Sequence, residues 1–200
     1  MAGDLHAPGP RDSDERLPGA RHSDGAVFVD RGEDARFARS NLRALSRGPG
    51  TIEIVPATLA HAEAIELRPG DRREIEALGL TPREGLVRCL ARSVWADTYL
   101  ADGEVAALTG LVLHPVVGGV AMPWLLTGRP VERHRKAFLR LTRARTQALL
   151  SEHGTLVAHV HAEYREALRW LAWLGFDLAP ARPLGARGAL FHQAILRARS

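Results

Sequence analysis

The stretch VAMPWLLTGRPVERHRKAFLRLTRARTQALL, residues 120–150, joins a β-rich run to the longest helical pattern of the chain. Val120–Leu126 follows a pair of glycines and predicts a strand. Pro123 within it is typical of a strand that leaves its neighbour and opens a cleft. Residues 131–150 carry apolar side chains at helical spacing, which predicts a helix that packs on a sheet.

Toward the C-terminus, the pattern predicts a strand, a helix and two further strands. Thr155–His161 alternates between apolar and other side chains, as a strand does. Residues 164–174 place apolar side chains at i, i+3, i+4 and i+7, which predicts an amphipathic helix. Gly175 ends that helix. The last two predicted strands are Phe176–Ala179 and Ala189–Leu196.

Toward the N-terminus, the pattern predicts a strand, three helices and a β-hairpin. The strand is Thr51–Val55, and the helices cover Leu59–Leu67, Asp71–Leu78 and a segment that starts at Pro82. The hairpin joins Trp95–Leu100 to Val105–Leu113 through Asp102-Gly103. These elements predict one mixed α/β domain over residues 51–200, of the α+β type with a mixed sheet.

Residues 1–50 have a different composition. They contain eight Arg and eight Asp or Glu, mixed with Pro, Gly and Ser, and little apolar periodicity. Such a segment buries too little apolar surface to offset the entropy of ordering. We predict a low-complexity N-terminal arm. Two parts of it, Ala26–Val29 and Asp34–Arg47, are candidates for ordering on a partner.

Positive charge is concentrated in one part of the predicted domain. The chain has a formal net charge of +4, and residues 129–145 contain seven basic residues and one acidic residue. A local positive field attracts phosphate groups. Few aromatic residues lie among these basic residues and no base-reading motif accompanies them, so we do not expect a nucleic-acid partner.

Other features exclude several classes of protein. No apolar run is long enough for a membrane span, and residues 1–10 do not read as a secretory signal. The single cysteine, Cys89, excludes an internal disulfide. His159 and His161 share a strand face but lack further ligands at a metal-binding spacing, so we expect no metal. A cytoplasmic location in a bacterial host, or a virion assembled there, is the simplest interpretation.

The order of the elements resembles the GNAT acyltransferase fold. More narrowly, MPWLLTG (122–128), RWLAWLGF (169–176) and ELRPGDRREIEALGL (66–80) resemble a GNAT-like group of phage and prophage proteins. That group is known as internal virion protein A of short-tailed phages. The resemblance covers about residues 51–197.

The resemblance implies a site for acetyl-CoA between two splayed parallel strands, here 120–126 and 155–161. The pantetheine arm would pair with the first strand, and the diphosphate would lie at the start of the next helix. The implied coenzyme residues are Leu125, Leu126, Thr127, Gly128, Arg133, Arg135 and Lys136. The turn departs from the family pattern, since it keeps one glycine and contains Pro130 and Glu132.

The resemblance also leaves the catalytic residues open. Alignment on Leu174-Gly175-Phe176 places Tyr164 where the family often has Asn, and Leu171 where it often has an acid Tyr. His161 and Tyr164 are the alternative acid or base candidates. Glu66 and Trp124 are the expected acceptor-pocket residues, and core packing is the alternative for Trp124. Glu66, Asp71 and Glu74 lie in the first helical region, where the family often contacts the acceptor. For all three we prefer the alternative interpretation, a solvated helix face.

Two functions follow from these observations. The first is an acyl-CoA-dependent N-acetyltransferase that acts on a small amine. The second is a catalytically inactive virion-associated protein that uses the same fold and the N-terminal arm to bind phage particle proteins.

Overall fold

A computed structural model describes residues 52–113 and 120–198. The predicted arm, residues 1–50, lies outside the described residues. The elements, in chain order, are β1 (Ile52–Pro56), α2 (Leu59–Ala64), α3 (Pro69–Ala77), α4 (Pro82–Arg92), β2 (Trp95–Ala101), β3 (Glu104–Leu113), β4 (Val120–Thr127), the 3₁₀ helix η1 (Arg129–Glu132), α5 (Arg135–His153), β5 (Thr155–His161), α6 (Arg165–Leu174), β6 (Asp177–Leu178), β7 (Arg182–Leu184) and β8 (Ala189–Arg197).

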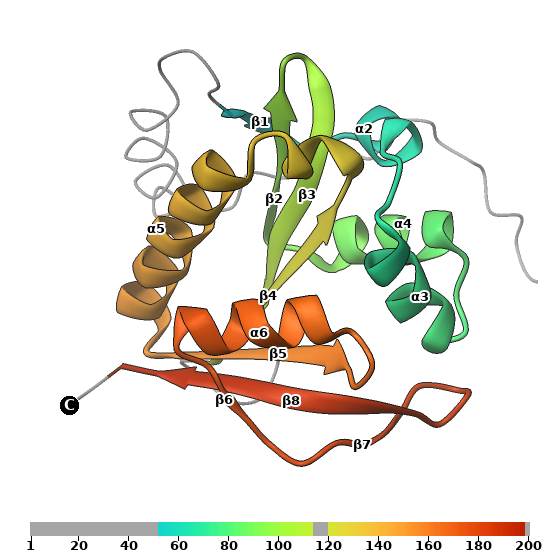
Figure 1. The fold of residues 1–200 in the computed structure, drawn as a ribbon, viewed down its shortest axis with the longest axis vertical. Helices are drawn as coiled ribbons and strands as arrows, with labels where there is room; N and C mark the ends of the chain where they lie inside the picture. Colours follow the sequence, from blue (N-terminus) through green and yellow to red (C-terminus); the bar gives the residue numbers. More distant parts are fainter. Residues whose placement is uncertain (1–51, 114–119, 199–200) are drawn as a thin grey trace, which may run out of the picture.

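The strands form one mixed sheet in the order β1-β2-β3-β4-β5-β8-β6, and β7 also pairs with β8. The pairs are antiparallel except for β4 and β5, which run parallel. Figure 1 shows β1–β4 with α2–α4 on one side of this junction, and β5–β8 with α6 on the other. We call these parts the β4 side and the β5 side.

Helices cover both faces of the β4 side. Leu108 packs in one core cluster with residues of α2, α3 and α4. The adjacent Ala107 packs in another cluster with Phe138 and Leu141 of α5. Because successive residues of a strand point to opposite faces, α5 lies on the face opposite to α2–α4. On the β5 side, Leu156 packs with Leu171 of α6.

The mixed α/β prediction is confirmed, with local differences at element ends. The first helix ends at Ala64 rather than at Leu67, because Leu67 forms a β-bridge with Gly128. The long helix starts at Arg135, since Pro130 belongs to a separate 3₁₀ turn. The sequence does not predict strand β7, because it has only three residues and the central one, Pro183, is disfavoured in strands.

The parallel junction is short. Strands β4 and β5 pair only through Val120 with Thr155 and Ala121 with Leu156. Beyond the second pair the strands diverge, and a cleft of about 1510 Å³ opens between the two sides. The expectation of splayed central strands is therefore met.

Candidate functional site

The cleft lies at the carboxyl ends of β4 and β5. Residues from α3, α4, β4, α5, β5 and α6 line it. One face of α3 enters the cleft with three side chains at a spacing of three residues, Arg68 at its N-cap, Asp71 and Glu74. These three residues connect the diverging sides.

Asp71 links the end of β4 to the start of α6, the helix that follows β5. Its Oδ2 accepts hydrogen bonds from the Thr127 hydroxyl at 2.5 Å and from the Tyr164 hydroxyl at 3.0 Å. Thr127 ends β4, whereas Tyr164 is the N-cap of α6. Burial raises the pKa of Asp71, and the two hydroxyl donors oppose that effect.

Glu74 is the titratable group best placed for proton transfer. Its Oε2 accepts the backbone N–H of His161 at 2.8 Å, and its Oε1 forms no hydrogen bond with the described residues. Burial raises the pKa of Glu74 to about 7, and the nearby charge of Asp71 adds to the increase. A carboxyl group with this pKa exchanges a proton readily near neutral pH.

Tyr164 depends on a glycine of α3 for its position. A Cβ atom at Gly70 would lie 2.2 Å from Cε2 of the Tyr164 ring. The ring therefore packs directly on the α3 backbone. Burial, followed by the charge of Asp71, raises the pKa of Tyr164. Because its hydroxyl donates to Asp71, its oxygen lone pairs are left to accept a hydrogen bond from a ligand.

Arg68 joins the segments that follow the two strands. Its Nε donates to Glu132 in η1 at 3.3 Å, and its Nη2 donates to Glu166 in α6 at 2.6 Å. The backbone N–H of Arg68 donates to Thr127 O at 2.9 Å. The start of α3 thus holds both sides of the cleft through polar contacts.

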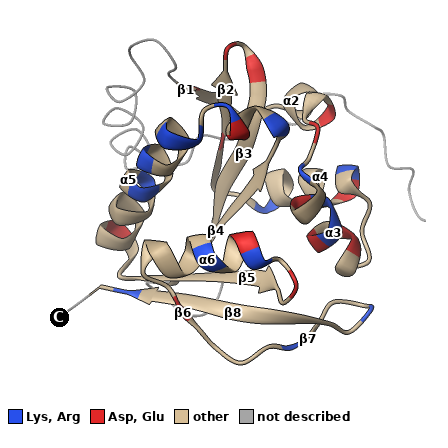
Figure 2. Ribbon diagram, in the orientation of Figure 1, with Lys and Arg blue, Asp and Glu red and all other residues tan. Residues whose placement is uncertain are grey.

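The start of α5 is the candidate anion site. No side chain caps its first amide groups, so these N–H groups and the helix dipole favour a negative charge. Arg135 and Lys136 are exposed there and form no ion pair with any residue in the described part of the chain. Figure 2 shows Lys and Arg residues along this helix. The donor set therefore fits the diphosphate of a coenzyme.

The turn before α5 offers fewer amide donors than the family pattern. The Gly128 N–H already donates to Ala106 O at 2.7 Å, and Pro130 has no N–H. A Cβ atom at Gly128 would lie 2.9 Å from Val105 O, so this glycine permits a close backbone approach. An anion at this place would depend on the α5 amides and on the two free basic side chains.

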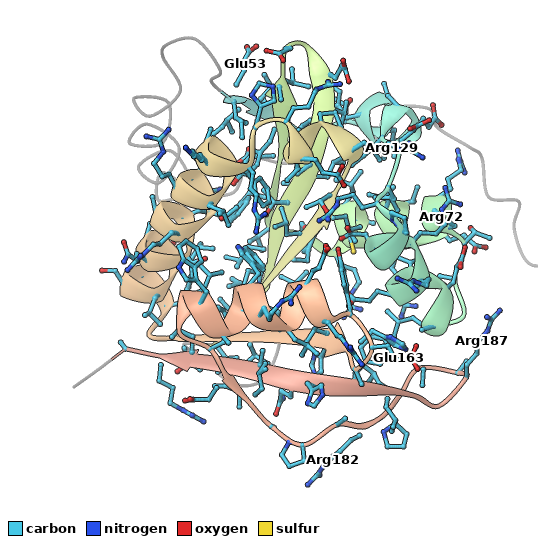
Figure 3. The ribbon with its side chains drawn as sticks, viewed as in Figure 1. Glu53, Arg72, Arg129, Glu163, Arg182 and Arg187 are labelled. Atoms are coloured by element: carbon cyan, nitrogen blue, oxygen red, sulfur yellow. The ribbon has the colours of Figure 1, made fainter. Side chains whose placement is uncertain are left out.

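The structure distributes the predicted site residues over several places. Leu125, Leu126, Thr127, Arg135, Trp124 and Tyr164 line the cleft. Arg133 forms an ion pair with Glu104 at 2.8 Å, and Glu66 forms one with Arg129 at 3.2 Å. Both pairs lie on the surface, and Figure 3 labels Arg129 there. Lys136 is exposed at the second position of α5.

The side chains of His161, Trp124 and Leu171 contact other residues of the protein. The His161 ring meets Phe191 edge to face, with ring centroids 5.2 Å apart. Trp124 donates its Nε1–H to Ser93 Oγ at 2.7 Å, and its ring covers Gly110. Leu171 is buried in the α6 core cluster. In the described residues, no group of three His, Cys, Asp or Glu is arranged to hold a metal ion.

Sequence reasoning preferred a solvated helix face for Asp71 and Glu74 over a role in the site. Asp71 is only 5% exposed, so the interpretation of a solvated helix face is wrong for it. The two carboxylates are three residues apart beside Ile75, which is buried. That spacing on the inner face of a helix was the available signal.

Comparisons with solved structures identify the architecture. The ribosomal-protein-S18-alanine N-acetyltransferase from Escherichia coli superposes with a TM-score of 0.53 at 16% identity, covering 75% of this chain and 96% of that chain. Ard1 from Thermoplasma volcanium gives 0.56 at 12% identity, with 74% and 99% covered. The chain has a GNAT-like fold.

A third GNAT-like structure contains a ligand. The structure of yncA from Salmonella typhimurium with its cofactor acetyl-CoA gives a TM-score of 0.50 at 14% identity, covering 75% of this chain and 95% of that chain. No family model and no curated protein sequence matches the chain. At these identities the similarity establishes the fold.

Across the described residues, none of the helices is long and apolar enough to span a membrane.

Proposed function

We propose that this GNAT-like chain is an acyl-CoA-dependent N-acyltransferase. The observation that carries the proposal is the divergence of β4 and β5 after two residue pairs, which leaves a deep cleft beside the start of α5. The free amide groups of that helix start, with Arg135 and Lys136, would hold the diphosphate. Leu125, Leu126 and Thr127 would line the pantetheine arm.

Glu74 is the proposed catalytic base. Acyl-CoA supplies a thioester carbon, and the acceptor amine must lose a proton before it attacks that carbon. Glu74 would take this proton on Oε1, while the His161 N–H holds Oε2. The C–N bond then forms and the C–S bond breaks with its electron pair on sulfur. The proton released by the attacking nitrogen ends on the thiolate, and Glu74 returns its own proton to solvent.

Calorimetric titration of the full chain with acetyl-CoA tests the coenzyme site. We expect a dissociation constant of about 1–100 μM, which corresponds to roughly 5.5–8 kcal/mol. The Arg135→Glu/Lys136→Glu variant should lose this binding. Arg140→Glu/Arg187→Glu is the matched control, because it changes the net charge equally at exposed residues outside the cleft lining. Equal weakening in both variants would refute a specific site at α5.

The pH dependence of the transfer tests the base. The rate should rise as the pH increases through about 7, because Glu74 accepts a proton only after losing its own. Glu74→Gln should lower the rate by about 10²–10⁴-fold without weakening acetyl-CoA binding. A variant rate with the same pH profile as the parent would exclude Glu74 as the base.

A second function is favoured by two observations at the same site. The Gly128 N–H is already used within the protein, and Leu171 provides no acid for the thiolate. A virion-associated protein that keeps the fold for binding, with the N-terminal arm as a contact to phage particle proteins, would need neither group. Absence of heat and of a thermal shift with millimolar acetyl-CoA, together with co-purification with phage particles, would support this alternative.

A further inference from the structure

The part of the cleft beside Glu74 contains charges of both signs. Its wall from α4 includes Arg88 and Arg92, which are four residues apart and therefore share one side of the helix. Neither arginine forms a hydrogen bond or an ion pair with a described residue. By contrast, Arg83 of the same helix pairs with Glu63 at 3.3 Å.

Cys89 lies on α4 between Arg88 and Arg92 in sequence, and all three line the same cleft as Glu74. The pKa of its thiol is raised to about 11, mainly by burial, whereas Arg92 and Arg88 lower it and Glu74 raises it. The two cations and the carboxylate thus act on the same atom from α4 and α3. The other titratable groups that face Glu74 are Asp71 on its own helix and Tyr164 across the cleft.

Apolar side chains line the same cleft as the charged groups. Ile75, Leu78 and Leu80 line the cleft from α3 and the segment after it, and Trp124 lines it from β4. The free oxygen of Glu74 and the Tyr164 hydroxyl are hydrogen-bond acceptors for an ammonium group. Arg88 and Arg92 are donors for an anion, with fork-shaped groups that suit a carboxylate.

We propose that the acceptor of this chain is an amine that also carries a carboxylate on an apolar body, with its ammonium at Glu74 and its carboxylate at Arg88 and Arg92. An apolar amino acid has this chemistry. The inference rests on the proposed transferase function, since it names the molecule that receives the acyl group. This acceptor differs from a simple amine, because an amine without a carboxylate would make no contact with either arginine.

The test compares ligands that differ in one charged group. Calorimetry on the full chain, with and without saturating coenzyme A, uses L-phenylalanine, L-phenylalaninamide and 3-phenylpropionate, and 6-aminohexanoate as a longer amino acid. At least one of the two amino acids should bind about tenfold more tightly than L-phenylalaninamide and 3-phenylpropionate, because each of these lacks one charged contact.

Variants assign the carboxylate contact. In Arg88→Gln/Arg92→Gln, binding of the amino acid should fall to the level of L-phenylalaninamide, while acetyl-CoA binding stays unchanged. Arg72→Gln/Arg187→Gln removes the same charge and is the control, since Figure 3 shows both side chains projecting away from the cleft. The control should bind as the parent does.

The outcomes separate the two proposals. If acetyl-CoA binds but neither amino acid binds more tightly than L-phenylalaninamide, this inference is overturned and the transferase proposal stays intact. Amino-acid binding that depends on Arg88 and Arg92 without any acetyl-CoA binding would support the site and reject the transferase function.

Discussion

Strand β4 has two neighbours, and it is joined to them very differently. It pairs with β3 through seven residue pairs, from Ala107–Thr127 to Leu113–Ala121, but with β5 through only two. Backbone hydrogen bonds to β3 hold the strand along most of its length. Beyond Ala121, side chains of α3 take the place of backbone pairing between β4 and β5. The contrast shows that the same strand is both part of a rigid sheet and one wall of a cleft.

The side-chain contacts across the cleft have a different physical character from the sheet. Arg68–Glu166, Asp71–Tyr164 and Glu74–His161 are all polar, and each includes a carboxylate. Backbone pairing tolerates most substitutions, whereas a contact of this kind depends on one side chain and its protonation state. Substitutions therefore separate the two kinds of junction, and the following four begin with the largest expected effect and end with the smallest.

Core truncation on each side gives the largest effect. Leu108 on the β4 side and Leu156 on the β5 side are both 0% exposed. Leu108→Ala and Leu156→Ala should each lower the free energy of unfolding by about 2–5 kcal/mol, measured by urea denaturation. Because only two residue pairs join β4 to β5, Leu156→Ala should speed amide exchange in β5 and β8 more than in β2 and β3. Uniform acceleration would mean that the two sides open as one unit.

Gly70→Ala should disrupt the polar contact between Asp71 and Tyr164. Its Cβ atom would overlap the Tyr164 ring, so the ring must move and the contact with Asp71 is lost. We expect a loss of about 1–3 kcal/mol in unfolding free energy by urea denaturation. Gly70→Ala/Tyr164→Ala is the matched control, and it should lose less than the sum of the two single changes. Strict additivity would show that the two residues are independent.

Glu74→Gln should stabilise the protein at high pH. The pKa of Glu74 is raised from 4.5 to about 7 in the folded state. The group therefore contributes stability below pH 4.5, and this contribution is lost as the pH rises through about 7. Gln cannot ionise, so the variant should gain about 3 kcal/mol over the parent at pH 8 relative to their difference at pH 4. Urea denaturation at both pH values measures it, and a constant difference would contradict the expectation.

Arg83→Ala should give the smallest effect. The Arg83–Glu63 pair joins α4 to α2 within the β4 side, and both side chains are well exposed. Removal of such a pair should change the unfolding free energy by less than about 0.5 kcal/mol. Thermal denaturation checks this value. A much larger loss would show that surface pairs contribute to the β4 side as strongly as its sheet does.

Local patterns in the sequence determined most of the elements and their order. Alternation predicted β5, helical spacing predicted α5 and α6, and Asp102-Gly103 predicted the β2–β3 hairpin. Each of these signals depends on neighbours within a few residues, which a single chain displays directly. Pro123 also indicated that β4 would leave a neighbour, and the two-pair junction with β5 agrees with that reading.

Only the tertiary structure decided which polar residues meet in the cleft. Asp71 lies 56 residues from Thr127 and 93 from Tyr164, and nothing in the local pattern distinguishes it from a solvated helix residue. Its burial, like the raised pKa of Glu74, arises because α3 packs against the ends of two strands that are distant in sequence. The desolvation of a carboxylate depends on everything that surrounds it in space, and the local pattern of the sequence does not display those neighbours.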